Sequence, residues 1–439
     1  MAALLVGCGD NNEVTSGVPV SQQSGATATA WFALQLVLVR ETPGFSPPVA
    51  SRAFAYSGIT LYESVVNGMR DFKSLGRVLT VMPEMPAIDL DGNYYWPASA
   101  NAALAQISRD MFPNASAENL AAIDELEARL AAAYVEKAGR ETLDRSAKYG
   151  RAVAAAIFKW STTDGGHEGF SRNFPAGYAP PMGAGLWVPT PPMFQPALQP
   201  FWGDNRPFLS PDNGQCDFGM PPPFSTQPGS EFYVEAKEVF DAVNNLTPEQ
   251  KEIALFWADE AMKTATPPGH SIAIATQLLD ADNASLAVAA ETYAKLGIAV
   301  SDAFISCWKM KFQFNLIRPI SYNRLVFDAM WSSFIVTPPF PEYPSGHSAQ
   351  SGAGSEVMTA MFGEVGFTDH TNDYRGIAPR SFDSFADAAN EAAISRLYGG
   401  IHYRSAIEDG LTMGACIGDR VNALPFREAV DSDGDFDGD

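Results

Sequence analysis

Residues 343–362 read YPSGHSAQSGAGSEVMTAMF, and the rest of the chain is organised around this stretch. Gly346 allows the backbone to approach a ligand closely, and Ser345 beside it supplies a hydroxyl group. The small and periodically apolar residues that follow predict a helix over 348–362, which opens at the preceding turn. The N-terminus of a helix carries unpaired N–H groups and a positive dipole end, so the turn predicts an anion site.

Two flanking stretches add cations and a second histidine. Upstream, Lys311 and Arg318 are seven residues apart, so a continuing helix would place both on one face until the following proline ends it. Downstream, Arg396 offers a planar fork that matches two oxygens of a tetrahedral oxyanion, and His402 follows it. Together with the turn and its histidine, these residues predict a cationic pocket of oxyanion size.

Helical periodicity extends over most of the chain, and period-2 alternation is nearly absent. The predicted fold is therefore all-α, with two helical halves that resemble four-helix bundles and a site in the core of the second. The predicted segments are 1–26 (a truncated signal and lipobox-like stretch with a polar linker), 27–162 (helical scaffold), 163–230 (connector), 231–425 (helical bundle with the oxyanion site) and 426–439 (acidic tail).

The connector, 163–230, is dense in proline and glycine. It contains Pro180-Pro181, Pro191-Pro192 and Pro221-Pro222-Pro223, so it cannot form regular helix or central strand. Tryptophan and phenylalanine are interleaved with the prolines, which predicts that the connector packs against the helices. It is either an ordered connection or a wall of a substrate channel.

The net charge of −22 argues against nucleic-acid and anionic-membrane partners, and the cationic pocket is a local exception to it. The longest apolar stretch, 30–39, is interrupted by Gln35 and is shorter than the roughly 18–20 residues that span a bilayer. We therefore expect no transmembrane segment. The aspartate-rich end, 431–439, is predicted to be a disordered acidic tail.

The cysteines bear on the compartment of the protein. Leu5-Val6-Gly7-Cys8 resembles a bacterial lipoprotein box, in which Cys8 would be lipidated, although the stretch before it lacks basic residues and is short for a signal peptide. We expect an exported protein, periplasmic or extracellular, with a lipid anchor at Cys8 left open. The other cysteines have no metal-binding spacing and leave open a disulfide among Cys216, Cys307 and Cys416.

The motifs resemble those of one superfamily, the type 2 phosphatidic acid phosphatases and the vanadium-dependent haloperoxidases, and in particular its soluble bacterial haloperoxidase-like branch. Its first motif, Lys, six residues, Arg-Pro, is matched by Lys311 and Arg318. Its second, Pro-Ser-Gly-His, is matched by residues 344–347. Its third, Ser-Arg, three residues, Gly, one residue, His, is matched by residues 395–402, but Ala406 replaces the closing Asp. Three motifs in the right order form a specific signal.

The resemblance implies a vanadate cofactor and a role for each motif residue. His402 would be the single protein ligand of vanadium, and His347 would be the acid–base group in the reaction of hydrogen peroxide with halide. The product would be a hypohalous acid equivalent that halogenates an organic acceptor. The oxygens of vanadate would be bound by Lys311, Arg318, Ser345, Gly346 and Arg396.

Two other functions fit the same residues. In a soluble acid phosphatase, His402 would be the nucleophile that forms a phosphohistidine, and His347 would protonate the leaving group. Such a nucleophile needs an orienting carboxylate, but Ala406 removes the usual one, and Asp409 would lie about 10 Å further along a regular helix. The haloperoxidase is therefore favoured. A lipid-anchored scaffold that has lost activity is disfavoured, because every other motif position holds a competent residue.

Other residues of the pocket follow from the resemblance alone. Trp308 and Phe340 match positions on the halide side of the pocket in fungal haloperoxidases, although core packing also explains single aromatic residues. Algal bromoperoxidases have a histidine where Phe340 stands, and one such position does not reveal halide preference. Asp259 is a candidate partner for Arg396, because family members place an acidic residue against that arginine. His270 follows a double proline and is predicted to start a helix rather than to bind a ligand.

Overall fold

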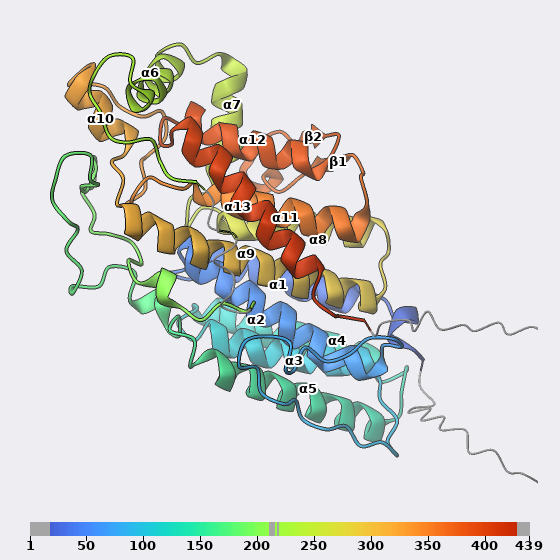
Figure 1. Cartoon of the computed structure of the whole chain (residues 1–439). Coiled ribbons are helices and arrows are strands. Elements are labelled where there is room, and N and C mark those ends of the chain that lie inside the picture. The colour runs from blue at the N-terminus through green and yellow to red at the C-terminus, as the bar shows by residue number, and fades with distance from the viewer. Residues whose placement is uncertain (1–17, 210–215, 217–218, 428–439) are drawn as a thin grey trace, which may run out of the picture.

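The computed structural model describes residues 18–209, 216 and 219–427, and within them the chain is mainly helical, as predicted (Figure 1). The expected lipid anchor at Cys8 and the acidic tail from 428 onward lie outside the described residues. In the part of the chain that is described, no helix combines the length and apolarity needed to cross a bilayer.

In the described part of the chain, the helices are accompanied by a two-stranded sheet. The α-helices are α1 (Ala26–Glu41), α2 (Pro47–Val65), α3 (Trp96–Met111), α4 (Ala117–Tyr134), α5 (Arg140–Ser161), α6 (Glu231–Asn244), α7 (Pro248–Phe256), α8 (Thr266–Ala281), α9 (Leu286–Phe314), α10 (Pro319–Val326), α11 (Gly346–Phe362), α12 (Phe385–Tyr398) and α13 (Arg404–Asn422). The 3-10 helices are η1 (Val20–Gln22), η2 (Val66–Gly68), η3 (Gly169–Ser171), η4 (Trp202–Asp204) and η6 (Asp373–Arg375).

The two halves of the chain meet at α2 and α9. In Figure 1, α2–α5 lie on one side of α9, and α11–α13 lie on the other. A Cβ atom on Gly58 of α2 would lie 2.2 Å from the carbonyl oxygen of Tyr293, so the two helix backbones are in direct contact. One hydrophobic core includes fully buried residues of both halves, such as Phe54 and Val300.

The small residues of α11 face α13, as the sequence predicts. A Cβ atom on Gly352 would lie 2.5 Å from the carbonyl oxygen of Leu411, and one on Gly414 would lie 2.0 Å from that of Ala349. The N-terminus of α11 therefore lies beside the start of α13, where the backbone N–H of Ser345 donates to the carbonyl oxygen of Ala406. This packing brings the second and third motifs together.

The expected helix through Lys311 and Arg318 is wrong. Helix α9 ends at Phe314, because Asn315 adopts a left-handed conformation with φ of 47° and its N–H closes on the carbonyl of Lys311. Arg318 is extended, as residues before proline usually are, and Pro319 begins α10 instead of ending a helix. The two cations still converge, through a turn.

The segment between α11 and α12 forms a short hairpin. Strand β1 (Phe367–Asp369) pairs antiparallel with β2 (Arg380–Phe382), with Phe367 opposite Phe382. Helix α12 begins at Phe385, because the side chain of Ser384 caps it by accepting from the N–H of Asp387.

The connector packs against the helices, which confirms that prediction. Trp187 and Trp202 are buried, and the backbone N–H of Trp187 donates to the carbonyl oxygen of Asn315 at 2.6 Å. Further along, the carboxylate of Asp302 on α9 accepts from the backbone N–H groups of Phe208 and Leu209 at 2.9 and 2.8 Å.

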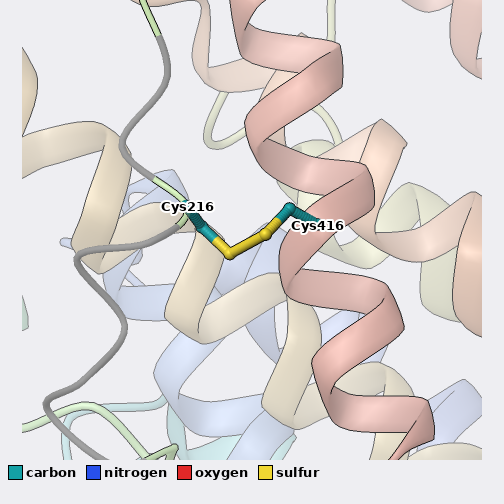
Figure 2. Close-up of a disulfide and its surroundings, with 2 residues drawn as sticks. All are labelled: Cys216 and Cys416. Atoms are coloured by element: carbon teal, nitrogen blue, oxygen red, sulfur yellow. A yellow bond between two sulfur atoms is a disulfide. The ribbon is translucent and has the colours of Figure 1, made fainter.

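A disulfide between Cys216 and Cys416 ties the connector to α13 (Figure 2). It joins residues 200 positions apart in the sequence. Among the described residues, Cys307 is a free and buried thiol. Of the disulfides that the sequence left open, the fold therefore forms the one that spans the second half of the chain.

Candidate active site

A cavity of about 470 Å³ is lined at one end by residues of the second and third motifs. Its inner end is formed by Gly346, His347, Arg396 and His402. Its walls are mostly apolar and come from α9, the loop before α11 and the connector, with Phe304, Trp308, Phe340, Pro339, Ile335, Phe174 and Leu198. The connector is thus both an ordered connection and a wall of the cavity.

His402 is held in one tautomer by Glu342. Its Nδ1 lies 2.8 Å from Oε1 of Glu342, and the backbone N–H of Tyr403 donates to the same oxygen at 2.9 Å. Because that oxygen accepts the backbone hydrogen bond, Nδ1 is the donor, and Nε2 of His402 keeps its lone pair. The guanidinium Nη1 of Arg318 donates to Nε2 at 3.2 Å.

The electrostatic setting keeps His402 neutral. Burial lowers the pKa of His402 well below its ordinary value, and the charges of Arg318 and Lys311 lower it further. Burial raises the pKa of Glu342 to about 8, against the opposing effect of the same two cations. A neutral imidazole whose Nε2 carries a lone pair is the form that binds a metal, and here that lone pair accepts from Arg318.

The cations of the first motif lie directly behind His402. Arg318 is fully buried, and it donates through Nε to the carbonyl oxygen of Phe340 and through Nη1 to that of Ile401, each at 2.8 Å. Lys311 is also fully buried, and its Nζ donates to the carbonyl oxygens of Pro341, Glu342 and Pro344. Burial lowers the pKa of Lys311 to about 7 and that of Arg318 to about 10.

Arg396 approaches the cavity from α12. Its Nε donates to Oγ of Ser395 at 2.8 Å, and its Nη2 donates to the carbonyl oxygen of Ala254 at 3.3 Å. Burial lowers the pKa of Arg396 to about 10, and the charge of Asp259 opposes this effect. The three motif cations therefore converge on one site from separate elements.

Several buried side-chain atoms around the site lack hydrogen-bond partners among the described residues; besides Oε2 of Glu342, they include Nη2 of Arg318 and Nε2 of His347. Buried donors and acceptors of this kind are costly unless a ligand completes them. Ser345 caps α11 by accepting from the N–H of Ser348 at 3.3 Å, which leaves its own O–H to donate. Together with the N–H of Gly346 at the helix start, these groups fit a tetrahedral oxyanion bonded to Nε2 of His402.

His347 is also neutral. Burial lowers its pKa well below the ordinary value, and the charges of Arg396 and His270 lower it further, whereas a hydrogen bond to the carbonyl of Trp257 opposes this. Because Nε2 has no partner among the described residues, the nitrogen that donates to Trp257 is Nδ1. Nε2 of His347 therefore has a lone pair available to take a proton.

The structure places the three remaining predicted residues in the cavity wall, but one contact differs from the prediction. The rings of Trp308 and Phe340 lie 4.9 Å apart, and both line the cavity. Asp259 lines it too, yet both of its carboxylate oxygens contact Nδ1 of His270, at 3.1 and 3.0 Å. Asp259 therefore acts on its predicted partner Arg396 through charge, raising the pKa of Arg396 against the effect of burial, while its hydrogen bonds go to His270 at the start of α8.

Sequence reasoning missed the residue that orients His402. Asp409 is engaged elsewhere, since it accepts from the hydroxyl of Tyr343 at 2.7 Å. Glu342 supplies the carboxylate that Ala406 cannot, and it does so from the loop before α11. A single acid in an otherwise apolar, proline-rich run ahead of the motif was the one signal in the sequence.

A neutral histidine beside buried cations at the end of a cavity is suited to bind a tetrahedral oxyanion, so the geometry defines an all-α protein with an oxyanion site. Residues 323–427 match the family model for the second helical-bundle domain of VCPO. The crystal structure of a bacterial vanadium-dependent iodoperoxidase is similar over 91% of this chain and 96% of its own, with 35% identity and a TM-score of 0.82. The chain belongs to the vanadium-dependent haloperoxidase family and is an oxidoreductase that uses vanadate.

More distant structures share the fold. The holo form of a bacterial vanadium-dependent chloroperoxidase has 17% identity and a TM-score of 0.66, over 88% of this chain and 93% of its own. The apo form of a bacterial vanadium-dependent chloroperoxidase has 16% identity and the same TM-score, over 87% of this chain and 94% of its own. Comparison with curated proteins gives no significant match.

Proposed function

We propose that this haloperoxidase oxidises iodide, and bromide more slowly, according to X⁻ + H₂O₂ + H⁺ → HOX + H₂O. The observation that carries the site assignment is the unpartnered Nε2 of His347 in the cavity that His402 also lines, together with the unpartnered Nη2 of Arg318, whose Nη1 contacts His402. The choice of iodide is supported by the 35% identity to a bacterial iodoperoxidase.

The groups of the pocket suit vanadate. Nε2 of His402 would bind the metal, and Arg318, Lys311 and Arg396 would neutralise the oxygens, with Ser345 and the N–H of Gly346 as further donors. Charge-assisted hydrogen bonds contribute roughly 1.5–3 kcal/mol each, so several can hold the oxyanion beside one protein ligand. When bound, vanadium(V) supplies a Lewis acid that activates hydrogen peroxide toward a halide.

His347 serves as the acid–base group in this proposal. Its Nδ1 is committed to the carbonyl of Trp257, which leaves Nε2 to take a proton from hydrogen peroxide as it arrives and to return it to the departing water. The lowered pKa means that the ring is neutral at rest and therefore ready to act as a base.

The walls of the cavity suit the other reactants. Trp308 and Phe340 form an apolar face close to the cations, with the guanidinium of Arg318 lying 4.9 Å from the ring of Phe340, which favours a weakly hydrated halide. Nearer the surface, the cavity is lined by the exposed side chains of Phe174, Met262 and Val336. A cavity of about 470 Å³ with such a rim suits an uncharged organic acceptor.

We also propose that the protein is exported. The disulfide between Cys216 and Cys416 supports this, because structural disulfides persist in oxidising compartments and are rare in the cytosol. A lipid anchor at Cys8 would keep the exported protein at the cell envelope. Labelling of intact cells with an acyl donor, with a Cys8→Ser variant as control, tests the anchor.

Halogenation assays test the function. Purified protein is incubated with hydrogen peroxide, monochlorodimedone and iodide, bromide or chloride in turn, before and after addition of orthovanadate. We expect halogenation that depends on orthovanadate and is fastest with iodide. Turnover that is fastest with chloride would refute the halide assignment, and turnover that is indifferent to orthovanadate would refute the site assignment.

One observation favours a second activity in the vanadate-free protein. A nucleophilic histidine needs a carboxylate on its other nitrogen, and Glu342 supplies one to His402 at 2.8 Å. The absence of the usual Asp at Ala406 therefore does not disable phosphoryl transfer. Hydrolysis of p-nitrophenyl phosphate by vanadate-free protein, inhibited by orthovanadate, would establish this activity.

A further inference from the structure

A buried ion network lies next to the oxyanion pocket and belongs to none of the three motifs. Its centre is His270, in the first turn of α8, with an exposed fraction of 2%. Nε2 of His270 lies 2.7 Å from Oδ2 of Asp369 on β1, and Nδ1 lies 3.1 and 3.0 Å from the carboxylate oxygens of Asp259. The indole ring of Trp257 stacks on the imidazole at 4.4 Å.

His270 is an imidazolium in this arrangement. Carboxylates only accept hydrogen bonds when ionised, so both ring nitrogens of His270 are donors. Burial lowers the pKa of His270, but the charges of Asp259 and Asp369 outweigh burial and raise it to about 10. Asp369 is fixed in turn by the backbone N–H of Thr371, which donates to its Oδ1 at 2.8 Å. The network therefore has one cation and two anions.

The network reaches the pocket through a single turn, residues 257–259. At one end of the turn, the carbonyl of Trp257 accepts from His347. At the other end, Asp259 lines the cavity together with Arg396, whose pKa its charge affects. Asp259 has a left-handed backbone with φ of 45°, which is unfavourable for a residue with a side chain unless its surroundings hold it.

We propose that His270 is a positioning residue of the oxyanion site. It occupies both oxygens of Asp259, so that this carboxylate does not form a two-pronged ion pair with Arg396, and the guanidinium remains directed at the oxyanion. By holding Asp259, it also fixes the turn whose carbonyl orients His347. This inference rests on the proposed function in one respect, that the oxyanion in the pocket is vanadate.

The net charge of the network predicts in which direction a substitution of His270 changes oxyanion binding. With His270 charged, the network carries a net charge of −1, and a neutral residue at position 270 would leave −2 beside an anion site. Such a change should weaken oxyanion binding. Neutralising Asp369 at the same time restores the net charge of the network to −1. The second substitution should therefore recover the affinity for the oxyanion.

The test measures binding of orthovanadate to the vanadate-free, full-length protein by isothermal titration calorimetry. The variants are His270→Gln, the double variant His270→Gln with Asp369→Asn, and the control His370→Gln. The control changes an exposed histidine whose Nδ1 contacts Asp373 at 2.9 Å, one residue from Asp369 in sequence. Circular dichroism confirms that each variant is folded.

We expect His270→Gln to weaken orthovanadate binding by about tenfold or more, as loss of supporting partners does in metal sites. The double variant should recover to within about threefold of the wild type, and the control should be unchanged. A folded His270→Gln that binds orthovanadate as the wild type does would overturn the inference. Wild-type protein that binds no orthovanadate would instead overturn the proposed function.

A measurement on the unaltered protein covers the case in which His270→Gln does not fold. The chain has five histidines, so ¹⁵N-histidine labelling gives a simple spectrum, in which the ring N–H signals of His270 are identified by their absence from the double variant. We expect these signals to shift as orthovanadate is added, while those of His370 do not. Unmoved His270 signals in protein saturated with orthovanadate would overturn the inference.

Discussion

At the scale of single residues, Glu342 supplies the orienting carboxylate that Ala406 cannot. The third motif of the family places its carboxylate one helical turn after the histidine, where this chain has a buried alanine. Glu342 reaches the same nitrogen from the loop before α11, at 2.8 Å. The function of orienting the ring is thus retained, while the residue that performs it has moved to another element.

Replacing Glu342 tests this directly. In Glu342→Gln an amide replaces the carboxyl group that accepts from Nδ1, so the ring is less strongly oriented, and we expect orthovanadate affinity to fall about 10- to 100-fold. The matched control is Asp409→Asn, which removes a different acid near the third motif, one that accepts from the hydroxyl of Tyr343. Isothermal titration calorimetry measures the orthovanadate affinity of both variants. An equal loss in Asp409→Asn would mean that Glu342 has no special role.

His347 should affect turnover without holding the oxyanion. In His347→Ala, the base at Nε2 is lost, so we expect the halogenation rate to fall by about 10²- to 10⁴-fold. Orthovanadate should still bind within about threefold of the wild-type affinity, because His402 and the motif cations are untouched. Steady-state assays and calorimetry on the same preparation separate the two effects. Loss of orthovanadate binding would contradict the role assigned to His347.

What the sequence predicts at this scale depends on spacing along the chain. The motif residues could be predicted because each lies at a fixed distance from another one. Glu342 and His270 could not, since each acts across space on a residue more than ten positions away. His270 was correctly expected at a helix start, but its two carboxylate partners come from residue 259 and from strand β1.

At the scale of elements, the contact between α2 and α9 depends on glycine. A Cβ atom at Gly58 would lie 2.2 Å from the backbone oxygen of Tyr293, which cannot move without displacing α9. We expect Gly58→Ala to destabilise the protein by about 1–3 kcal/mol. Gly177→Ala is the control, because no atom lies within 4 Å of its added methyl group. Equal denaturation midpoints for the two variants would refute the close contact.

Helix positions were largely predictable from periodicity, whereas helix ends near the site were not. The period continues through residues 311–318, but Asn315 takes a left-handed conformation and its side-chain oxygen accepts from the hydroxyl of Tyr178 at 2.9 Å. A long-range contact with the connector thus accompanies the end of α9. No pattern within the helix itself encodes that contact, which is why a continuing helix was predicted.

At the scale of the whole molecule, the disulfide spans 200 positions and links the connector to α13. Cross-links that close long loops restrict the unfolded chain, and their removal typically costs about 2–5 kcal/mol. We expect the double variant Cys216→Ser with Cys416→Ser to unfold at lower denaturant concentration than the wild type. Reductant should shift the wild type by a similar amount and leave the double variant unchanged. A reductant effect of equal size on both would exclude the disulfide as its cause.

The buried ion network should make the stability of the whole molecule depend on alkaline pH. The pKa of His270 is raised from 6.5 to about 10 in the folded protein, so its contribution to stability is complete below about pH 6.5 and is lost as the pH rises toward 10. The melting temperature should therefore fall across this window.

The net charge of −22 also destabilises the protein at high pH through repulsion, and that contribution remains when His270 is replaced. The double variant His270→Gln with Asp369→Asn should accordingly show a shallower fall than the wild type, since it has lost the titrating group and kept the charge of the network. Parallel melting curves for the two proteins from pH 6.5 to 10 would mean that His270 does not titrate in this range.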